Sequence, residues 1–176
     1  MVQIYTLEDA AHTRCQLLLY RNIENAAAVR QLIMKGQVEA SLIKPDMLVD
    51  AFQVLVAANK AVRSLNAKKM TTRSVFAEII YNLSTTKKIS DSLTSFGLGD
   101  SDTDILAVLL DPDVEEKTKK LKSQIEGEIF PLDQLSTLTN QSKVIEYYKI
   151  TPEELSISSL LDSVVSRMAC KEFFSM

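Results

Sequence analysis

Continuous apolar runs and amphipathic stretches alternate along the chain, and the two patterns predict different elements. Residues 14–20 and 105–110 are short, continuously apolar runs, which are typical of buried strands. A third short strand is expected over residues 40–43, where Pro45 ends it. Because these strands come without a regular strand–helix alternation or a glycine-rich first turn, we expect a mixed α/β fold. Its sheet should be small, mixed or antiparallel, and packed against several helices.

Apolar residues that recur at intervals of three and four predict the helices. The longest begins at Asp50, and Ser74 is expected to cap a shorter one, although the β-branched residues after Ser74 leave a strand as the alternative. Asn25 and Asp113 stand where two other helices should start. The expected helices cover residues 25–36, 50–67, 74–83, 89–97, 113–125 and 140–148. Residues 128–140 show no readable pattern.

The last segment carries the clearest helical pattern. Thr151 and Pro152, followed by two glutamates, form a signature of a helix start. Beyond it the chain keeps one broad apolar stripe, flanked mainly by serines, whose members are Ile157, Leu160, Leu161, Val164, Val165 and Met168. The pattern predicts an amphipathic helix over residues 156–168, which either closes the core or contacts a partner protein.

The composition indicates one globular domain over residues 1–176. Apolar residues make up 46% of the chain and charged residues 24%, which suits a single buried core at this length. No run approaches the length of a membrane span, and the first residues lack the pattern of a secretory signal, so we expect neither. Cys15 and Cys170 are far apart in the sequence, so we expect two free, buried thiols and a cytosolic and nuclear location.

Charge is distributed unevenly along the chain. The formal net charge is −3, yet residues 59–88 contain seven basic side chains and one acid, Glu78, and therefore carry +6. The basic residues are Lys60, Arg63, Lys68, Lys69, Arg73, Lys87 and Lys88. Such a segment is either an ordinary solvated set of helix ends and loops or a site for phosphate. Backbone N–H groups at the helix start near Ser74 would serve the second role.

No pattern of residues predicts catalysis, so we expect a protein without enzymatic activity, metal or cofactor. Phosphate-binding glycine loops and the GxSxG and HExxH motifs are missing. His12 is the single histidine, and with two distant cysteines it cannot complete a structural zinc site. Two alternatives remain open. One is a small-ligand-binding or enzymatic α/β domain that uses the basic groove of residues 59–88, and the other is a purely structural, dimer-forming domain.

Four stretches of the sequence, taken in order, resemble one known family. They are FQVLVAANKAV (52–62), KMTTRSVFAEIIYNLS (69–84), KISDSLTSFGL (88–98) and SISSLLDSVVSRM (156–168). In this combination the chain resembles the TPRKB-like kinase-binding subunits of the KEOPS complex, which is also called EKC. The resemblance extends from residue 15 to residue 168 and is weak between residues 111 and 140.

The resemblance implies that the chain works by binding. Members of this family have an α/β fold without catalytic activity, and they bind and regulate a small atypical kinase of the p53-related type. That kinase in turn binds the threonylcarbamoyl transferase subunit, and the complex forms N6-threonylcarbamoyladenosine next to the tRNA anticodon. Family members also bind the 3′ CCA end of tRNA.

The family's motifs can be carried over to individual positions of this chain. The kinase-binding residues would be Ile157, Leu160, Leu161, Val164 and Arg167. The tRNA-binding residues would be Asn59, Lys60, Lys69, Thr72 and Arg73, because single-stranded RNA offers phosphates to Lys and Arg and base edges to Asn and Thr.

Overall fold

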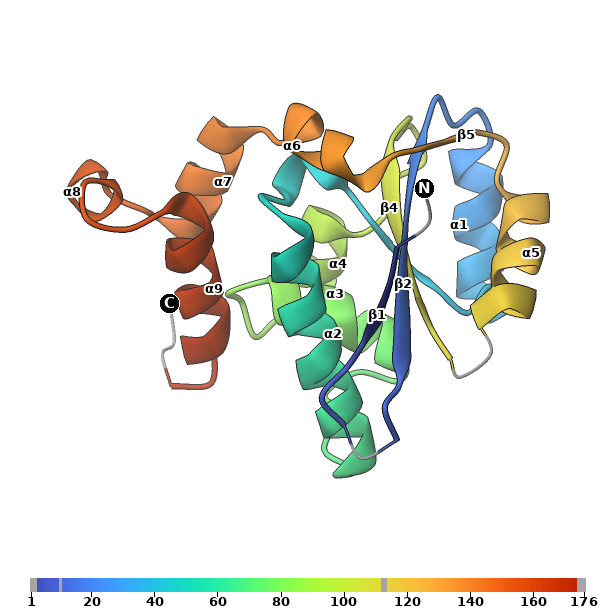
Figure 1. The fold of residues 1–176 in the computed structure, drawn as a ribbon, viewed down its shortest axis with the longest axis horizontal. Coiled ribbons are helices and arrows are strands. Elements are labelled where there is room, and N and C mark those ends of the chain that lie inside the picture. The colour runs from blue at the N-terminus through green and yellow to red at the C-terminus, as the bar shows by residue number, and fades with distance from the viewer. Residues whose placement is uncertain (1–2, 10, 112–113, 174–176) are drawn as a thin grey trace.

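The computed structural model describes residues 3–9, 11–111 and 114–173, and the strands within them form one sheet (Figure 1). The strands are β1 (Gln3–Thr6), β2 (Arg14–Arg21), β3 (Ser41–Ile43), β4 (Ile105–Leu110) and β5 (Glu128–Phe130). Their order is β1-β2-β4-β3, and every pairing is antiparallel. β4 occupies one edge of β2, so β1 and β5 share the other edge at its two ends. The α/β fold with an antiparallel sheet is confirmed.

Helices cover both faces of the sheet. α1 (Ala26–Met34) and α5 (Val114–Gln124) lie on one face, and the other helices lie on the opposite face (Figure 1). These are α2 (Ala51–Asn66), α3 (Val75–Leu83), α4 (Ile89–Phe96), α6 (Leu135–Leu138), α7 (Gln141–Tyr148), α8 (Pro152–Leu155) and α9 (Leu160–Cys170). Two short 3₁₀ turns, Pro45–Met47 and Leu132–Gln134, complete the described elements. Within the described part of the chain, none of the helices has the length and apolar character needed to cross a bilayer.

The two-sided cover explains why the central strands are continuously apolar. In β2, Leu17 and Leu19 belong to the core under α2, α3 and α9, whereas Leu18 and Tyr20 belong to the core under α1 and α5. All six residues of β4 are buried in the same alternating manner. A strand with helices on both faces has no solvent-facing side, so neither set of alternate positions needs to be polar.

Side-chain caps start the helices that position the candidate site. Asp50 accepts a hydrogen bond from Phe52 N at 2.7 Å to begin α2, and Ser74 accepts one from Ala77 N at 3.1 Å to begin α3. The helical prediction after Ser74 is therefore confirmed over the strand alternative. Asn25 precedes α1 as predicted, but its amide bonds to the end of α5 instead of capping. Asp113 lies outside the described residues.

Three predictions about local structure differ from the fold. Residues 128–140 are ordered as β5, a 3₁₀ turn and α6, which were missed because each element is only three or four residues long. Cys15 is buried and free as expected, whereas Cys170 is free but exposed, because it lies on the outer side of α9. The helix predicted over residues 156–168 begins only at Leu160, because residues 156–159 connect α8 to α9.

Candidate functional site

The C-terminal region contains two helices where the sequence predicted one. α9 begins at its own cap, because Ser159 Oγ accepts a hydrogen bond from Asp162 N at 3.1 Å and lies 2.7 Å from Asp162 Oδ2. Ile157 therefore lies in the connection between α8 and α9, where 88% of it is exposed. The prediction of one helix is wrong because this second helix start lies inside the apolar stripe.

The apolar stripe of α9 divides into an inner and an outer row. Val164 and Met168 are buried, and Leu160 packs against the same core. Leu161 and Val165 directly follow Leu160 and Val164 in the sequence and therefore form a second row along α9. Both are half-buried and belong to neither core cluster. Val164, predicted to contact a kinase, is 0% exposed and therefore cannot reach a partner. Val165 is not among the predicted kinase-binding residues, although it follows Leu161 by four positions and therefore lies on the same side of α9.

Arg167, the last predicted kinase-binding residue, is engaged within the chain. Its guanidinium forms a bidentate ion pair with Glu154, with N–O distances of 2.6 and 2.7 Å. It also donates to the carbonyl oxygens of Ser163 at 3.3 Å and Lys149 at 3.1 Å. Hydrogen bonding to Arg167 lowers the pKa of Glu154 to about 2. Arg167 therefore ties α8 to α9 and fixes the connection that presents Ile157.

Glu154→Gln should make thermal stability less sensitive to acid. The folded-state pKa of Glu154 is about 2, below its ordinary 4.5, so the ion pair stabilises the fold at neutral pH and is lost as the pH falls from 4.5 toward 2. By circular dichroism, the variant should melt below the wild type at about pH 6 and approach it near about pH 2.5. Glu153→Gln removes the neighbouring exposed acid and should follow the wild type throughout. An equal melting deficit at both pH values would contradict an ion-pair origin.

The loop between α2 and α3 is organised by one buried carboxylate. Glu78 is 2% exposed and accepts hydrogen bonds from the backbone N–H groups of Thr71, at 3.1 Å to each oxygen, and Thr72, at 2.7 Å. Thr72 Oγ1 also lies 2.7 Å from the carboxylate, so this hydroxyl is used inside the loop. The backbone of the loop is thereby fixed while the side chains of Lys69 and Arg73 remain exposed.

Asn59 and Lys60 lie apart from that loop, in the middle of α2. About 9 Å of helix separates Lys60 from Asn66, the last residue of α2. Lys60 Nζ is 3.3 Å from a carboxylate oxygen of Glu172, and Asn59 Oδ1 is buried without a hydrogen-bond partner among the described residues. Of the predicted tRNA-binding residues, the structure therefore brings Lys69, Thr72 and Arg73 together in the loop between α2 and α3. Asn59 and Lys60 lie apart from them, further toward the N-terminal end of α2.

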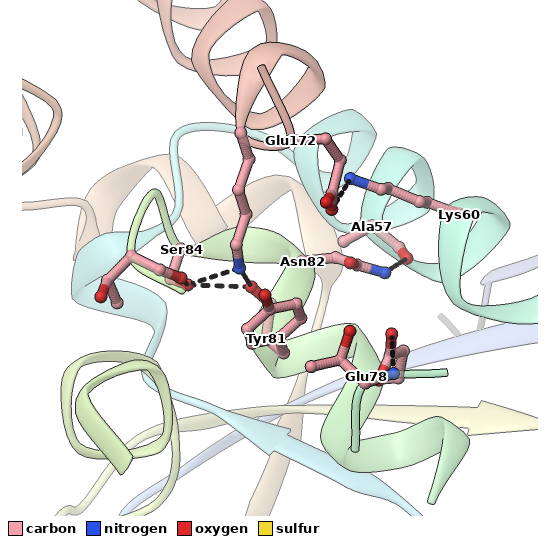
Figure 2. A network of polar contacts seen from close by, with 10 residues as sticks. Ala57, Lys60, Glu78, Tyr81, Asn82, Ser84 and Glu172 are labelled. Atoms are coloured by element: carbon pink, nitrogen blue, oxygen red, sulfur yellow. Dashed lines mark hydrogen bonds and ion pairs between the residues drawn. The ribbon is translucent and has the colours of Figure 1, made fainter. Parts of the chain in front are cut away.

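A buried lysine lies beside Lys60 and was not predicted. Lys171 is 2% exposed, and its Nζ donates to the Tyr81 carbonyl and to Ser84 Oγ, the latter at 3.1 Å. The same Nζ lies 3.1 Å from the centre of the Tyr81 ring. Figure 2 shows Tyr81 and Ser84 together with the nearby pair of Lys60 and Glu172. Burial, and next the charge of Lys60, lower the pKa of Lys171 to about 7. No sequence pattern distinguishes Lys171 from an ordinary surface lysine.

An enzymatic or ligand-binding site in the basic groove gains no support from this geometry. Both oxygens of Glu78, the acid that such a site would use, accept hydrogen bonds from the loop. Two hollows in the described surface, one beside Lys117 and one of about 350 Å³ beside Tyr147, are lined by no residue of the segment 59–88. Over the ranges that the structure describes, no three metal-binding side chains gather, and His12 is exposed.

Comparison with known proteins agrees with the resemblance found in the sequence. The family model for the kinase binding protein CGI-121 matches residues 20–172. The EKC/KEOPS complex subunit TPRKB of Danio rerio is 42% identical over 158 residues, which cover 88% of this chain and 89% of that protein. The EKC/KEOPS complex subunit cgi121 of Aspergillus fumigatus is 32% identical, and the match covers 76% of this chain and 75% of that protein.

Proposed function

The chain belongs to the CGI-121 family of kinase-binding proteins, and on that premise we propose that it is a non-catalytic EKC/KEOPS subunit that binds a small atypical kinase. The observation that carries the proposal is the family match over residues 20–172. The threonylcarbamoyl transferase subunit would be reached indirectly, through the kinase, and the protein would work in the cytosol and nucleus.

The kinase-binding surface proposed here is the outer apolar row, which consists of Ile157, Leu161 and Val165. These three side chains are exposed or half-buried, come from α9 and the connection before it, and are not needed to fill the core. An apolar row along one side of a helix fits a hydrophobic groove on a partner, and a residue such as Ile157 can serve as an anchor. The hydrogen bonds of Arg167 stabilise this surface, because they hold the connection between α8 and α9, which carries Ile157, in one position.

The direct test of kinase binding is co-elution of the purified chain with the kinase from the same cell. We expect one species in size-exclusion chromatography whose mass equals one copy of each protein. Separate elution at micromolar concentrations of both proteins would contradict the proposal. An isolated chain that sediments as a dimer, and stays a dimer when the kinase is added, would favour the dimer-forming alternative.

We further propose that the subunit helps to recruit tRNA through its 3′ CCA end. Support comes from the loop between α2 and α3, where Lys69 and Arg73 are exposed on a backbone that Glu78 holds in place. Basic side chains on an ordered loop can bind the phosphates of single-stranded RNA, and fixing the loop in advance reduces the entropy lost on binding. Thr72 would act mainly by shaping the loop, because its hydroxyl already contacts Glu78.

Replacing both Lys69 and Arg73 by alanine should weaken tRNA binding about tenfold at low salt. If each side chain contacts one phosphate of the single strand, the negative slope of log affinity against log salt should become shallower by about 1.4. Fluorescence anisotropy with labelled tRNA at several salt concentrations measures both quantities. Lys119→Ala combined with Lys122→Ala removes two exposed charges on α5, across the sheet, and should leave affinity and slope unchanged. Equal effects of the two double variants would show a non-specific charge effect and contradict the placement.

A further inference from the structure

The last described turn of the chain, residues 171–173, combines one buried charge with exposed neighbours. Lys171 is 2% exposed, while Cys170, Glu172 and Phe173 around it are all exposed. A lysine is rarely buried to this degree unless its ammonium group finds partners. The partners of Lys171 therefore decide where this turn lies.

Lys171 completes the C-terminal end of α3. The carbonyl of Tyr81 lies in the last turn of that helix, and Ser84 is the residue that follows its end. The Tyr81 carbonyl also accepts hydrogen bonds from Ser84 N at 3.3 Å and Ser84 Oγ at 2.9 Å, and the partial negative charge at the C-terminus of a helix makes an additional ammonium group favourable there. Ser84 is itself held by Ser92, with 2.6 Å between their Oγ atoms, so the acceptor for Lys171 is in a fixed place.

Anchoring of Lys171 places the next side chain, Glu172, over α2. One oxygen of its carboxylate is 3.3 Å from Lys60 Nζ, and Figure 2 shows Glu172 reaching toward Lys60 across the polar network. The Lys60 ammonium, one of the predicted tRNA contacts, is thus paired within the chain. An acid paired with a phosphate-binding lysine competes with RNA for it.

We propose that the turn of residues 171–173 is an autoinhibitory latch, in which Lys171 fixes the turn against α3 and Glu172 occupies Lys60. RNA gains the Lys60 contact only when Glu172 leaves. The inference rests on the proposed tRNA binding and adds a regulation of it. The turn continues directly from α9, the helix of the outer apolar row, so a partner that shifts the end of α9 also acts on the latch.

The test is tRNA binding by the full chain carrying Glu172→Gln. Freeing one lysine should raise the affinity about fivefold at low salt and make the salt slope steeper by about 0.7. Lys60→Ala combined with Glu172→Gln should abolish the gain, because the lysine that Glu172→Gln frees is then missing. Glu126→Gln, at an exposed acid far from α3, makes the same change in net charge and should leave affinity unchanged.

A second variant, Lys171→Met, tests the anchor separately. Methionine keeps an apolar stem but donates no hydrogen bond, so the turn should detach from α3 and tRNA affinity should rise at least as much as with Glu172→Gln. Hydrogen exchange follows the turn without RNA, because Phe173 N donates to the Cys170 carbonyl at 2.9 Å and should exchange faster in Lys171→Met.

The outcomes separate the latch from the function on which it rests. If neither the wild type nor Glu172→Gln binds tRNA, the proposed tRNA function fails and the latch fails with it. If the wild type binds and the paired Lys69 and Arg73 variant weakens binding, while Glu172→Gln and Lys171→Met bind no more tightly than the wild type, the latch alone is wrong. A gain in Glu172→Gln that survives Lys60→Ala would also overturn it.

Discussion

Leu161→Glu should weaken binding of the kinase by about 100-fold or more while leaving this chain folded. Leu161 is half-buried on α9 and belongs to neither core cluster, so its apolar surface is available to a partner. A carboxylate there would have to be desolvated inside an apolar interface without a counter-charge, which costs several kcal/mol. The helix itself should tolerate the change. Position 161 is in the first turn of α9, after the cap at Ser159, where acidic side chains are favourable.

Isothermal titration of the kinase into each variant, together with circular dichroism, measures this prediction. Met34→Glu is the matched control, because Met34 is an exposed apolar residue on α1, across the sheet from α9 (Figure 1). It makes the same change of charge and should bind the kinase with the wild-type affinity. Wild-type affinity in a folded Leu161→Glu variant would remove α9 from the interface. A comparable loss in Met34→Glu would show that net charge, and not the outer apolar row, controls binding.

Glu78→Gln should lower the free energy of unfolding by about 2–4 kcal/mol. The carboxylate receives two backbone N–H groups and faces one hydroxyl, all from Thr71 and Thr72. Glutamine offers one oxygen and one NH₂ group, so at least one N–H donor of the loop would face another donor in a buried place. The loop should loosen, and the Thr71 and Thr72 amides should exchange faster with solvent.

Urea unfolding followed by circular dichroism measures the loss of stability, and hydrogen exchange measures the loop. Glu146→Gln, at an exposed acid on α7, is the control and should unfold at the wild-type urea concentration. An unchanged midpoint in Glu78→Gln would mean that the loop keeps its shape without the carboxylate. In that case the pre-ordering argued for Lys69 and Arg73 would have to come from elsewhere.

The fold was predictable from sequence where an apolar run was continuous or where a capping residue preceded a periodic apolar pattern. Residues 105–110 could be assigned as a strand because both faces are buried, and Asp50 and Ser74 marked helix starts because each hydroxyl or carboxylate accepts a backbone N–H. The pairing partners of the strands could not be predicted, since β2 contacts β4 almost a hundred residues away. Such contacts leave no local pattern.

The candidate site was predictable in outline but not in its contacts. The spacing of residues 157–168 indicated an apolar stripe, yet not which side faced the core, because that depends on where α9 packs against α2 and α7. The segment 59–88 was recognisable by charge, whereas the burial of Glu78 and Lys171 follows from tertiary contacts alone. A charged residue in a sequence is expected to be exposed, so these two could be found only in the structure.

The completion of α3 by Lys171 has a consequence for how the protein is made. α3 is nine residues long, too short to be stable in water by itself, and its Tyr81 carbonyl, which the N–H and hydroxyl of Ser84 also contact, accepts a hydrogen bond from Lys171, a residue far along the chain. Residue 171 is synthesised 88 residues after Leu83, the last residue of α3. A nascent chain therefore has α3 without its Lys171 contact until residue 171 has been synthesised, and the turn of residues 171–173 can dock against α3 only after that point.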